Sequence, residues 1–504
     1  MTMQMSGAPD PLALKDAAKH PRGLYTLFFT EMWERASYYG MRAILVLFLV
    51  ASVAKGGLGL DDKSAAAIYG VYTACVYLFA LPGGWIADRL LGLRRAVWYG
   101  GLIITAGHFS MALPWTETFF LGLVLIVLGT GLLKPSISGI VGELYKGDTG
   151  ARRDAGFSIY YMGINLGAIM GPLICGYLGE NVNWHYGFAA SGIGMALGLL
   201  QYRLSQKHLD DAGEYTPPAI DDTVRQQFNR RAWSFVWIGT GLFMAFVIAA
   251  MMGLVTINAG AIAAQGTAVI VVLFVLDFIY IYRGGITDVE KKRLWAAAVL
   301  YLFSALFWAG FEQSGSSFNL FAERYTDRFF GTWEMPASWL QSFNPLFIIL
   351  LAPFFANLWV RLGVRNLDPS SPVKFTIALL GLGIGFAVMA LAANYVVSGQ
   401  QVLPSWLIMT YLIFTMAELC ISPIGLSLTT KLAPKGYAAQ MLGLFFMSSS
   451  IGNLFAGIIA GRLGHDSVAD MPGLFGQMFI FCAGAAVLLY LIRKPLSRLM
   501  GGIR

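Results

Sequence analysis

Ionisable side chains that could exchange protons stand close together in one apolar stretch near the start of the chain. The charged residues there are Glu31, Glu34, Arg35 and Arg42, with Tyr38 among them. At about 100° per helical residue, Glu34 and Arg35 fall beside Glu31 on one helix face. Arg42 returns to the same face two turns after Arg35. Two acids beside two bases favour a site that takes up and gives back a proton; the alternative is a charge-neutral cluster that only pins two helices.

Three more ionisable residues, Lys134, Glu312 and Glu418, each stand alone in a separate apolar stretch. A charge at the centre of a bilayer is costly and marks a functional site by default. Each needs a partner from another helix. We expect two acids and one base to meet the first cluster around a central cavity.

The apolar stretches that hold these residues dominate the composition. Of the 504 residues, 57% are hydrophobic and 12% are charged, against about 25% charged in a typical soluble domain. Blocks of ~20 apolar residues cross a ~30 Å hydrocarbon core as helices. They lack the alternation of barrel strands. The sequence predicts an all-α integral membrane protein. The net charge of +7 sits in short loops, which argues against nucleic acid as a partner.

We predict fourteen spans, at about 23–53, 65–87, 95–113, 118–140, 155–178, 186–202, 232–255, 258–282, 295–322, 342–362, 373–396, 402–428, 440–462 and 473–492. An even count places both termini on one side. Most Lys and Arg lie in the loops of that side, and the other side carries only Lys55, Lys63, Arg324, Arg328 and Arg462. The positive-inside rule makes the termini cytoplasmic, and we expect a multi-pass protein of a bacterial inner membrane.

The chain divides into two halves at the polar segment 203–231, which contains Pro217-Pro218 and reads as a linker. An apolar hairpin follows it. Two six-helix bundles with an inserted hairpin correspond to a major facilitator fold. The expected parts are a tail at 1–22, a bundle at 23–202, the linker at 203–231, the hairpin at 232–282, a second bundle at 283–494 and a tail at 495–504.

The segment GGWIADRLLGLRR, from Gly83 to Arg95, resembles the loop motif of the major facilitator superfamily. Asp88, Arg89 and Gly92 occupy its characteristic positions. The resemblance implies a gating role for Asp88 and Arg89 rather than contact with a substrate.

Five further segments resemble the proton-coupled oligopeptide transporter family, prokaryotic type. They are EMWERASYYG (31–40), GTGLLKPSISGIVG (129–142), FSIYYMGINLGAI (157–169), FWAGFEQSGSS (307–317) and AELCISPIGLSLTTKLAP (417–434). The first and third are specific signatures, with Ala36 in place of the usual Phe. The sequence departs from relatives at Gly70, where animal members have a histidine, and at Phe445, where several bacterial members have a tryptophan.

The resemblance implies a role for each matching residue. A peptide carboxylate would be held by Arg42 and Lys134, and its amino end by Glu418, Asn165 and Asn344. The walls of the substrate site would be Tyr38, Tyr39, Tyr69, Trp308, Phe445 and Ser422. Protons would be carried or relayed by Glu31, Glu34, Arg35 and Glu312. Two further expectations come from the residues themselves. Arg42 and Glu312 lie past the midpoints of spans that run outward, so we expect them to form a gate near the outer mouth. Because an unpaired buried ammonium would lose its proton, we expect Lys134 to pair with the first-span acids or with Glu418 when no peptide is bound.

The expected function is that of a proton-coupled symporter that imports di- and tripeptides by alternating access, as a monomer in the lipid bilayer. No cofactor beyond protons and no metal site is expected. Independently of the resemblance, a cavity with one basic wall and one acidic wall fits the two opposite charges of a peptide zwitterion. The alternative is a transporter with the same fold and the same proton coupling that carries nitrate, an amino acid or a drug. A membrane-embedded enzyme or a receptor is more remote, because the spans lack a nucleophile-base pair or metal-ligand spacing.

Overall fold

The computed structural model describes residues 20–146, 151–214, 259–435, 437–463 and 468–503, and scattered residues between 226 and 249. Most of the predicted tail at 1–22, the later part of the linker and most of the predicted span at 232–255 lie outside the described residues. Each of the other predicted spans coincides with helical structure, although the spans at 65–87 and 295–322 each comprise three consecutive helical pieces.

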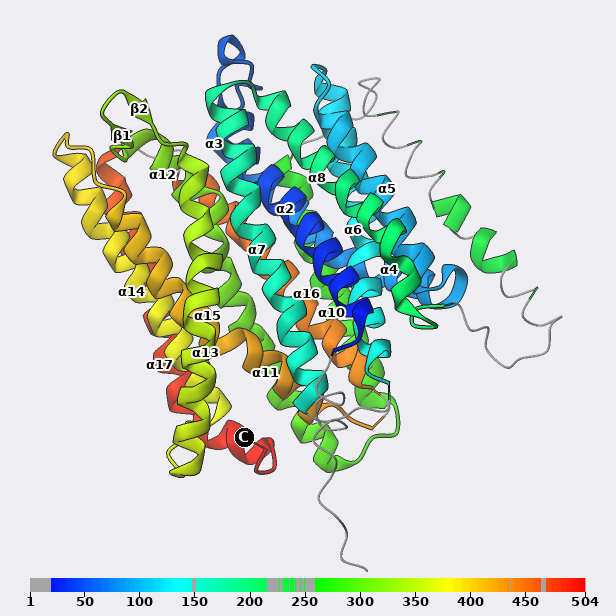
Figure 1. Cartoon of the computed structure of the whole chain (residues 1–504). Helices are drawn as coiled ribbons and strands as arrows, with labels where there is room; N and C mark the ends of the chain where they lie inside the picture. The colour runs from blue at the N-terminus through cyan, green and yellow to red at the C-terminus, as the bar shows by residue number, and fades with distance from the viewer. Residues whose placement is uncertain are drawn as a thin grey trace, which may run out of the picture.

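The first half of the chain forms long helices joined by short loops (Figure 1). Their bounds are α2 Arg22–Val50, α3 Asp62–Leu78, α4 Ala80–Ile86, η2 Ala87–Leu91, α5 Leu93–Met111, α6 Thr116–Leu144, α7 Ala151–Asn181, α8 Trp184–Ser205 and η3 Gln206–Leu209, with the short turn η1 Val53–Lys55 after α2. The second predicted span is therefore built from three consecutive helical pieces.

The second half repeats this pattern after the inserted helix α10 Ala259–Arg283. Its elements are α11 Asp288–Phe311, η4 Glu312–Gly315, α12 Ser317–Tyr325, β1 Phe329–Phe330, β2 Trp333–Glu334, η5 Ala337–Ser342, α13 Phe343–Val364, α14 Ser371–Val397, α15 Ser405–Leu432, α16 Ala438–Leu463, η6 Val468–Asp470 and α17 Met471–Leu499. The two strands form a small antiparallel hairpin. Nine helices within the described residues are long and apolar enough to cross a membrane.

Local sequence signals fix where several helices begin. Asp61 precedes α3, and its carboxylate accepts a hydrogen bond from the backbone N–H of Ser64 at 3.0 Å. Thr287 and Glu290 form a capping box at the start of α11. Both devices satisfy backbone donors that a helix leaves open at its first turn.

Glycines on α7 hold it against α2, the helix that carries the acid-base cluster. Gly163, Gly167 and Gly171 recur every four residues and face α2. A Cβ on Gly167 would lie 2.2 Å from the Met32 carbonyl oxygen, and a Cβ on Gly171 would lie 2.3 Å from that of Ala36. Only glycine permits this approach of two backbones. Small residues on α7 therefore set the distance between it and α2.

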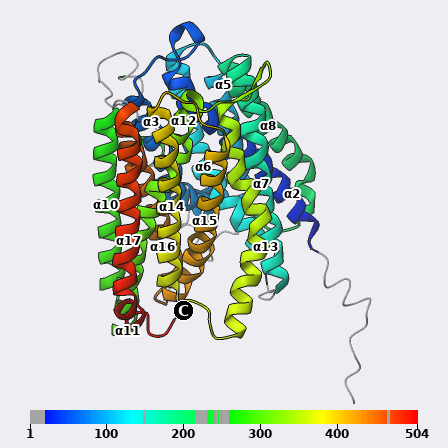
Figure 2. The ribbon, with the colours of Figure 1, turned by 90° about the vertical axis from the view of Figure 1, so that its left-hand side faces the viewer.

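The polar contacts that join the two halves gather toward the end of the bundle opposite the C-terminus, here called the far end (Figures 1 and 2). Arg324 makes a paired salt bridge to Asp62, with N–O distances of 2.6 and 2.7 Å. The Glu180 carboxylate accepts a hydrogen bond from the backbone N–H of Ala337 at 2.7 Å. Trp339 Nε1 donates to the Leu173 carbonyl oxygen at 2.9 Å. The far end is therefore closed.

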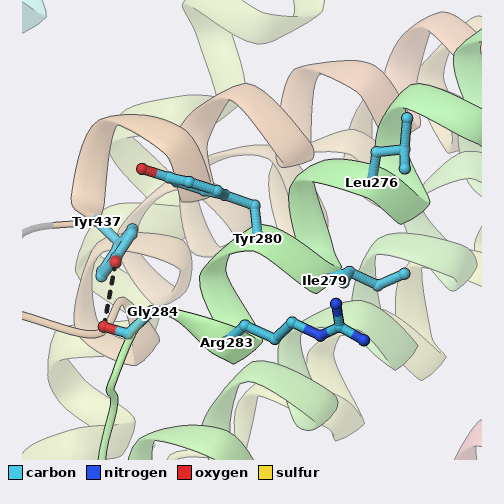
Figure 3. Close-up of a pocket in the computed structure, with 6 residues that line it drawn as sticks. All are labelled: Leu276, Ile279, Tyr280, Arg283, Gly284 and Tyr437. Atoms are coloured by element: carbon cyan, nitrogen blue, oxygen red, sulfur yellow. Dashed lines mark hydrogen bonds between the residues drawn. The ribbon is translucent and has the colours of Figure 1, made fainter.

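The inserted helix α10 packs against α3 of the first half and α16 of the second. At its end the Tyr437 hydroxyl donates a hydrogen bond to the Gly284 carbonyl oxygen at 3.3 Å. A pocket of about 410 Å³ opens there, lined by Leu276, Ile279, Tyr280, Arg283, Gly284 and Tyr437 (Figure 3). The insertion thus contacts both halves.

Candidate substrate and proton site

The acid-base cluster on α2 is buried and held together by one guanidinium. Arg35 Nε lies 3.2 Å from Glu31 Oε1. The Arg35 guanidinium also contacts both carboxylate oxygens of Glu34, with Nη2 2.8 Å from Oε1. All three side chains are at most 3% exposed. One cation faces two carboxylates, so this group alone carries a surplus negative charge.

Lys134 on α6 lies near this cluster without joining it. Its Nζ stands 4.3 Å from the centroid of the Tyr77 ring, a cation–π contact. Among the described residues no carboxylate lies within 4 Å of Nζ, so the expected ion pair with the first-span acids or Glu418 is not formed. Arg35, on the same helix as the two acids, already contacts both carboxylate oxygens of Glu34 and Oε1 of Glu31. Glu31 Oε2 is buried and has no hydrogen-bond partner among the described residues. Lys134 stays within electrostatic range of both acids.

Arg42 on α2 and Glu312 on η4 connect the two halves directly. Arg42 Nη2 contacts Glu312 Oε2, and Arg42 Nε donates to the Tyr69 hydroxyl at 2.6 Å. The guanidinium carbon lies 5.8 Å from the centroid of the Tyr39 ring. Arg42 is 7% exposed and Glu312 is 3% exposed. The pair lies past the midpoint of α2 toward the far end, where the halves meet.

Glu418 on α15 and Asn344 on α13 meet in the second half. Asn344 Nδ2 donates to Glu418 Oε2 and to Thr415 Oγ1, each at 3.0 Å. The Glu418 carboxylate is also within electrostatic range of Tyr39 and Tyr161. Asn165 is buried on α7, and its Nδ2 donates to the Tyr161 carbonyl oxygen of its own helix at 3.0 Å. The structure joins Glu418 and Asn344, while the Asn165 amide N–H is engaged locally.

The aromatic residues expected to line the substrate site differ in burial. Tyr38 and Tyr69 are enclosed, at 2% and 0% exposed. Tyr39 and Trp308 are half-buried. Phe445 is also enclosed, because its ring packs against Tyr301 with centroids 5.7 Å apart. In this conformation, therefore, Tyr39 and Trp308 present more surface than the other three.

The remaining expected residues lie in different settings. Ser422 is half-buried on α15, and among the described residues its hydroxyl has no hydrogen-bond partner. Asp88 and Arg89 are exposed on η2, which lies toward the other end of the bundle from the Arg42–Glu312 pair. Gly92 follows at φ 80°, a conformation that favours glycine. The structure thus separates the loop-motif charges from the central polar residues.

Two contact residues escaped the sequence reasoning. Tyr77 supports Lys134, and Thr415 shares the Asn344 amide with Glu418. A signal existed for Tyr77, because it follows Tyr69 by eight residues through Thr73 and so lies on the same helix face. Thr415 precedes Glu418 by three residues, which also places both on one face.

Comparison with known proteins bears on this arrangement. The family model described as the POT family, PTR2, matches residues 94–469. The chain belongs to the POT family. The expected family resemblance, the major facilitator fold and the transporter class are therefore confirmed.

Two bacterial transporters are similar to nearly the whole chain. Peptide transporter YePEPT of Yersinia enterocolitica is 44% identical, with 95% of each chain covered. A di-/tripeptide transporter of Lactococcus lactis is 37% identical, with 96% of this chain and 97% of the relative covered. The first half, including α2, thus falls within the similarity as well.

Solved structures of the POT family agree in fold. The crystal structure of peptide transporter POT in complex with sulfate superposes with a TM-score of 0.87 at 39% identity, covering 95% of this chain and 96% of that one. A mutant of peptide transporter POT in complex with alafosfalin superposes with a TM-score of 0.85 at 40% identity, with the same shares of each chain covered.

Proposed function

We propose that this chain is a symporter that imports di- and tripeptides together with protons by alternating access. One observation carries the proposal: basic groups from the first half and an acidic group from the second belong to one buried polar region. Arg42 and Lys134 supply the positive charge, and Glu418 with Asn344 supplies the negative wall. A peptide zwitterion carries opposite charges at its two ends, which suits such a site.

In this proposal the peptide carboxylate binds Arg42 and Lys134, and the amino group binds Glu418, Asn344 and Asn165. Tyr38, Tyr39, Tyr69, Trp308, Phe445 and Ser422 line the space for the peptide side chains. Apolar and aromatic walls accept many side chains, because they impose few directed hydrogen bonds.

Proton coupling follows from the charge balance of the α2 cluster. Glu31 and Glu34 are balanced by Arg35 and by the nearby positive charge of Lys134. A peptide carboxylate that binds Lys134 neutralises the positive charge of its ammonium group. The two acids then have one negative charge in excess, which favours protonation of one of them. Peptide binding and proton binding thereby support each other.

Closure of the far end by Arg42 and Glu312 fits one state of an alternating-access cycle. We infer that the termini and the linker at 203–231 are cytoplasmic, in a bacterial inner membrane, with bundles at 23–202 and 283–494 and the hairpin at 232–282 between them. The structure then corresponds to an inward-facing state. Asp88 and Arg89 stabilise a gate on the cytoplasmic side. The transporter acts as a monomer.

The test is uptake of labelled dialanine into proteoliposomes that contain the purified protein. An inward proton gradient should drive accumulation, and excess unlabelled dialanine inside should drive counterflow without a gradient. Tripeptides should compete, whereas nitrate and free amino acids should not. Accumulation of nitrate or of an amino acid in place of dialanine would support the alternative substrate classes.

A further inference from the structure

A second pocket lies on the outside of the first half, at the end of the bundle opposite the far end. It measures about 310 Å³ and is lined by Arg94, Arg95, Trp98, Tyr99, Arg203 and Gln206. The first four residues begin α5, and the last two end α8 and begin η3. The two helices pack against each other, so three guanidinium groups and two aromatic rings gather at one point of the surface.

The three arginines are not equivalent. Arg94 is committed to the protein: its Nε donates to the Ala212 carbonyl oxygen at 2.7 Å, and Nη1 lies 3.0 Å from Glu214 Oε1. Arg203 donates to Gln206 Oε1 at 3.2 Å and stands over the Trp98 ring at 5.8 Å. Its positive charge thus has no carboxylate partner within the described part of the chain.

Arg95 is exposed, and it too makes no ion pair with any residue that the structure describes. Two of the three charges therefore have no counter-ion among the residues that the structure describes. A surface pocket with two unneutralised guanidinium groups has the chemistry to bind a phosphate, because guanidinium groups bind phosphate oxygens with two parallel hydrogen bonds.

An apolar surface runs from this pocket toward the far end. On α8, Leu204, Leu200 and Leu197 are 69%, 55% and 43% exposed. On α5, Tyr99 and Leu102 are 48% and 42% exposed. Spacings of three and four residues put each set on one helix face. A cationic pocket at the end of two adjoining apolar helix faces is complementary to a phospholipid. The pocket matches the charged headgroup, and the apolar faces match the acyl chains.

We propose that this pocket binds the headgroup of an anionic phospholipid of the bilayer. The lipid phosphate contacts Arg95 and Arg203, Trp98 and Tyr99 lie at the level of the glycerol, and the acyl chains lie along Leu102, Leu200 and Leu204. Aromatic residues favour this depth of a membrane, and basic pockets on the cytoplasmic side bind anionic headgroups. The proposal is independent of the transported substrate.

The test is native mass spectrometry of the full-length protein titrated with phosphatidylglycerol and, separately, with phosphatidylcholine of the same acyl chains. We expect the wild type to retain one phosphatidylglycerol in preference to phosphatidylcholine. The double variant Arg95→Gln/Arg203→Gln should bind phosphatidylglycerol about 30-fold more weakly, since each lost cation near the surface costs about fivefold. Binding of phosphatidylcholine should not change.

The matched control is Arg361→Gln/Arg365→Gln, which removes the same charge from the exposed end of α13. Arg94 stays in place in every variant, because it holds the segment after η3. An equal loss in the control, or no loss in the pocket variant, would overturn the proposal. Displacement of the lipid by millimolar inorganic phosphate would also overturn it, since the pocket would then be a site for soluble anions.

Discussion

Arg42 on α2 and Glu312 on η4 form a buried ion pair although 270 residues separate them in the chain. The two residues come from different halves, and Arg42 also donates a hydrogen bond to Tyr69 of α3. In the proposed mechanism, protonation of Glu312 removes one charge from the pair. The far end can then open, and Arg42 becomes free for the peptide carboxylate.

Exchanging the charges of this pair distinguishes two possible roles, a purely structural salt bridge and a gate that opens when Glu312 is protonated. The single variant Arg42→Glu should lower stability by about 3–5 kcal/mol, because it leaves like charges buried together. The double variant Arg42→Glu/Glu312→Arg should recover most of the thermal stability in detergent. It should not recover gradient-driven dialanine uptake, because a guanidinium in place of the Glu312 carboxylate does not release a proton near neutral pH. Wild-type accumulation by the double variant would contradict the proton role of Glu312.

Replacing Glu34 by Gln tests the proton role of the α2 cluster. The variant keeps the shape of the side chain but cannot take up a proton. We expect gradient-driven accumulation of dialanine to be lost, while counterflow of dialanine without a gradient continues at a reduced rate. Both are measured in the same proteoliposomes. Full accumulation in this variant would show that Glu34 carries no coupled proton.

Removing the ammonium of Lys134 tests its contact with the substrate. Because it forms no ion pair with a described carboxylate, Lys134→Ala should leave the fold intact, which elution and thermal unfolding would show. Its loss should weaken dialanine binding by about tenfold or more, the usual effect of a lost hydrogen bond to a charged group. Driven uptake should fall with it. Near-normal affinity and uptake would leave Lys134 as a counter-ion of the α2 cluster.

Closure of the far end depends on a close approach of α3 and α16. A Cβ on Gly70 would lie 2.9 Å from the Gly457 Cα. We therefore expect Gly70→Ala to push the helices apart, at a cost of about 1–3 kcal/mol to the closed state. In a cysteine-free background, Ser342→Cys reports this change, since Ser342 is 6% exposed and bonds to the Ile169 carbonyl oxygen across the halves.

Labelling of the thiol introduced by Ser342→Cys with an impermeant maleimide from outside should rise several-fold when Gly70→Ala is added, and uptake should slow. Gly476→Ala is the control, because a Cβ there would meet no atom within 4 Å. Unchanged labelling with Gly70→Ala would mean that the helices absorb the methyl group without opening.

Much of the fold was accessible from the sequence because it depends on local chemistry. An apolar block of ~20 residues in lipid must pair its own backbone groups, so helices at 118–140 or 373–396 follow from hydropathy alone. The neighbours of Glu31 and Glu34 on α2 follow from helix periodicity, since Arg35 lies within one turn of both. The motifs around Asn165 and Lys134 identified the family, which the comparisons confirmed.

Contacts between helices were decided only by the tertiary structure, because they depend on how each helix is rotated and how closely it approaches its neighbours. The sequence led us to expect a carboxylate partner for Lys134, yet its ammonium lies over the Tyr77 ring. The sequence likewise did not specify that the Phe445 ring packs against Tyr301. The contact between Arg42 and Glu312 was expected from the sequence, and the structure forms it. The Asn344–Glu418 hydrogen bond and the closed far end also require two distant helices to meet. Hydropathy does not specify which helices come into contact. Glycines such as Gly167 and Gly70 permit the close approach of neighbouring backbones where the tertiary structure brings them together.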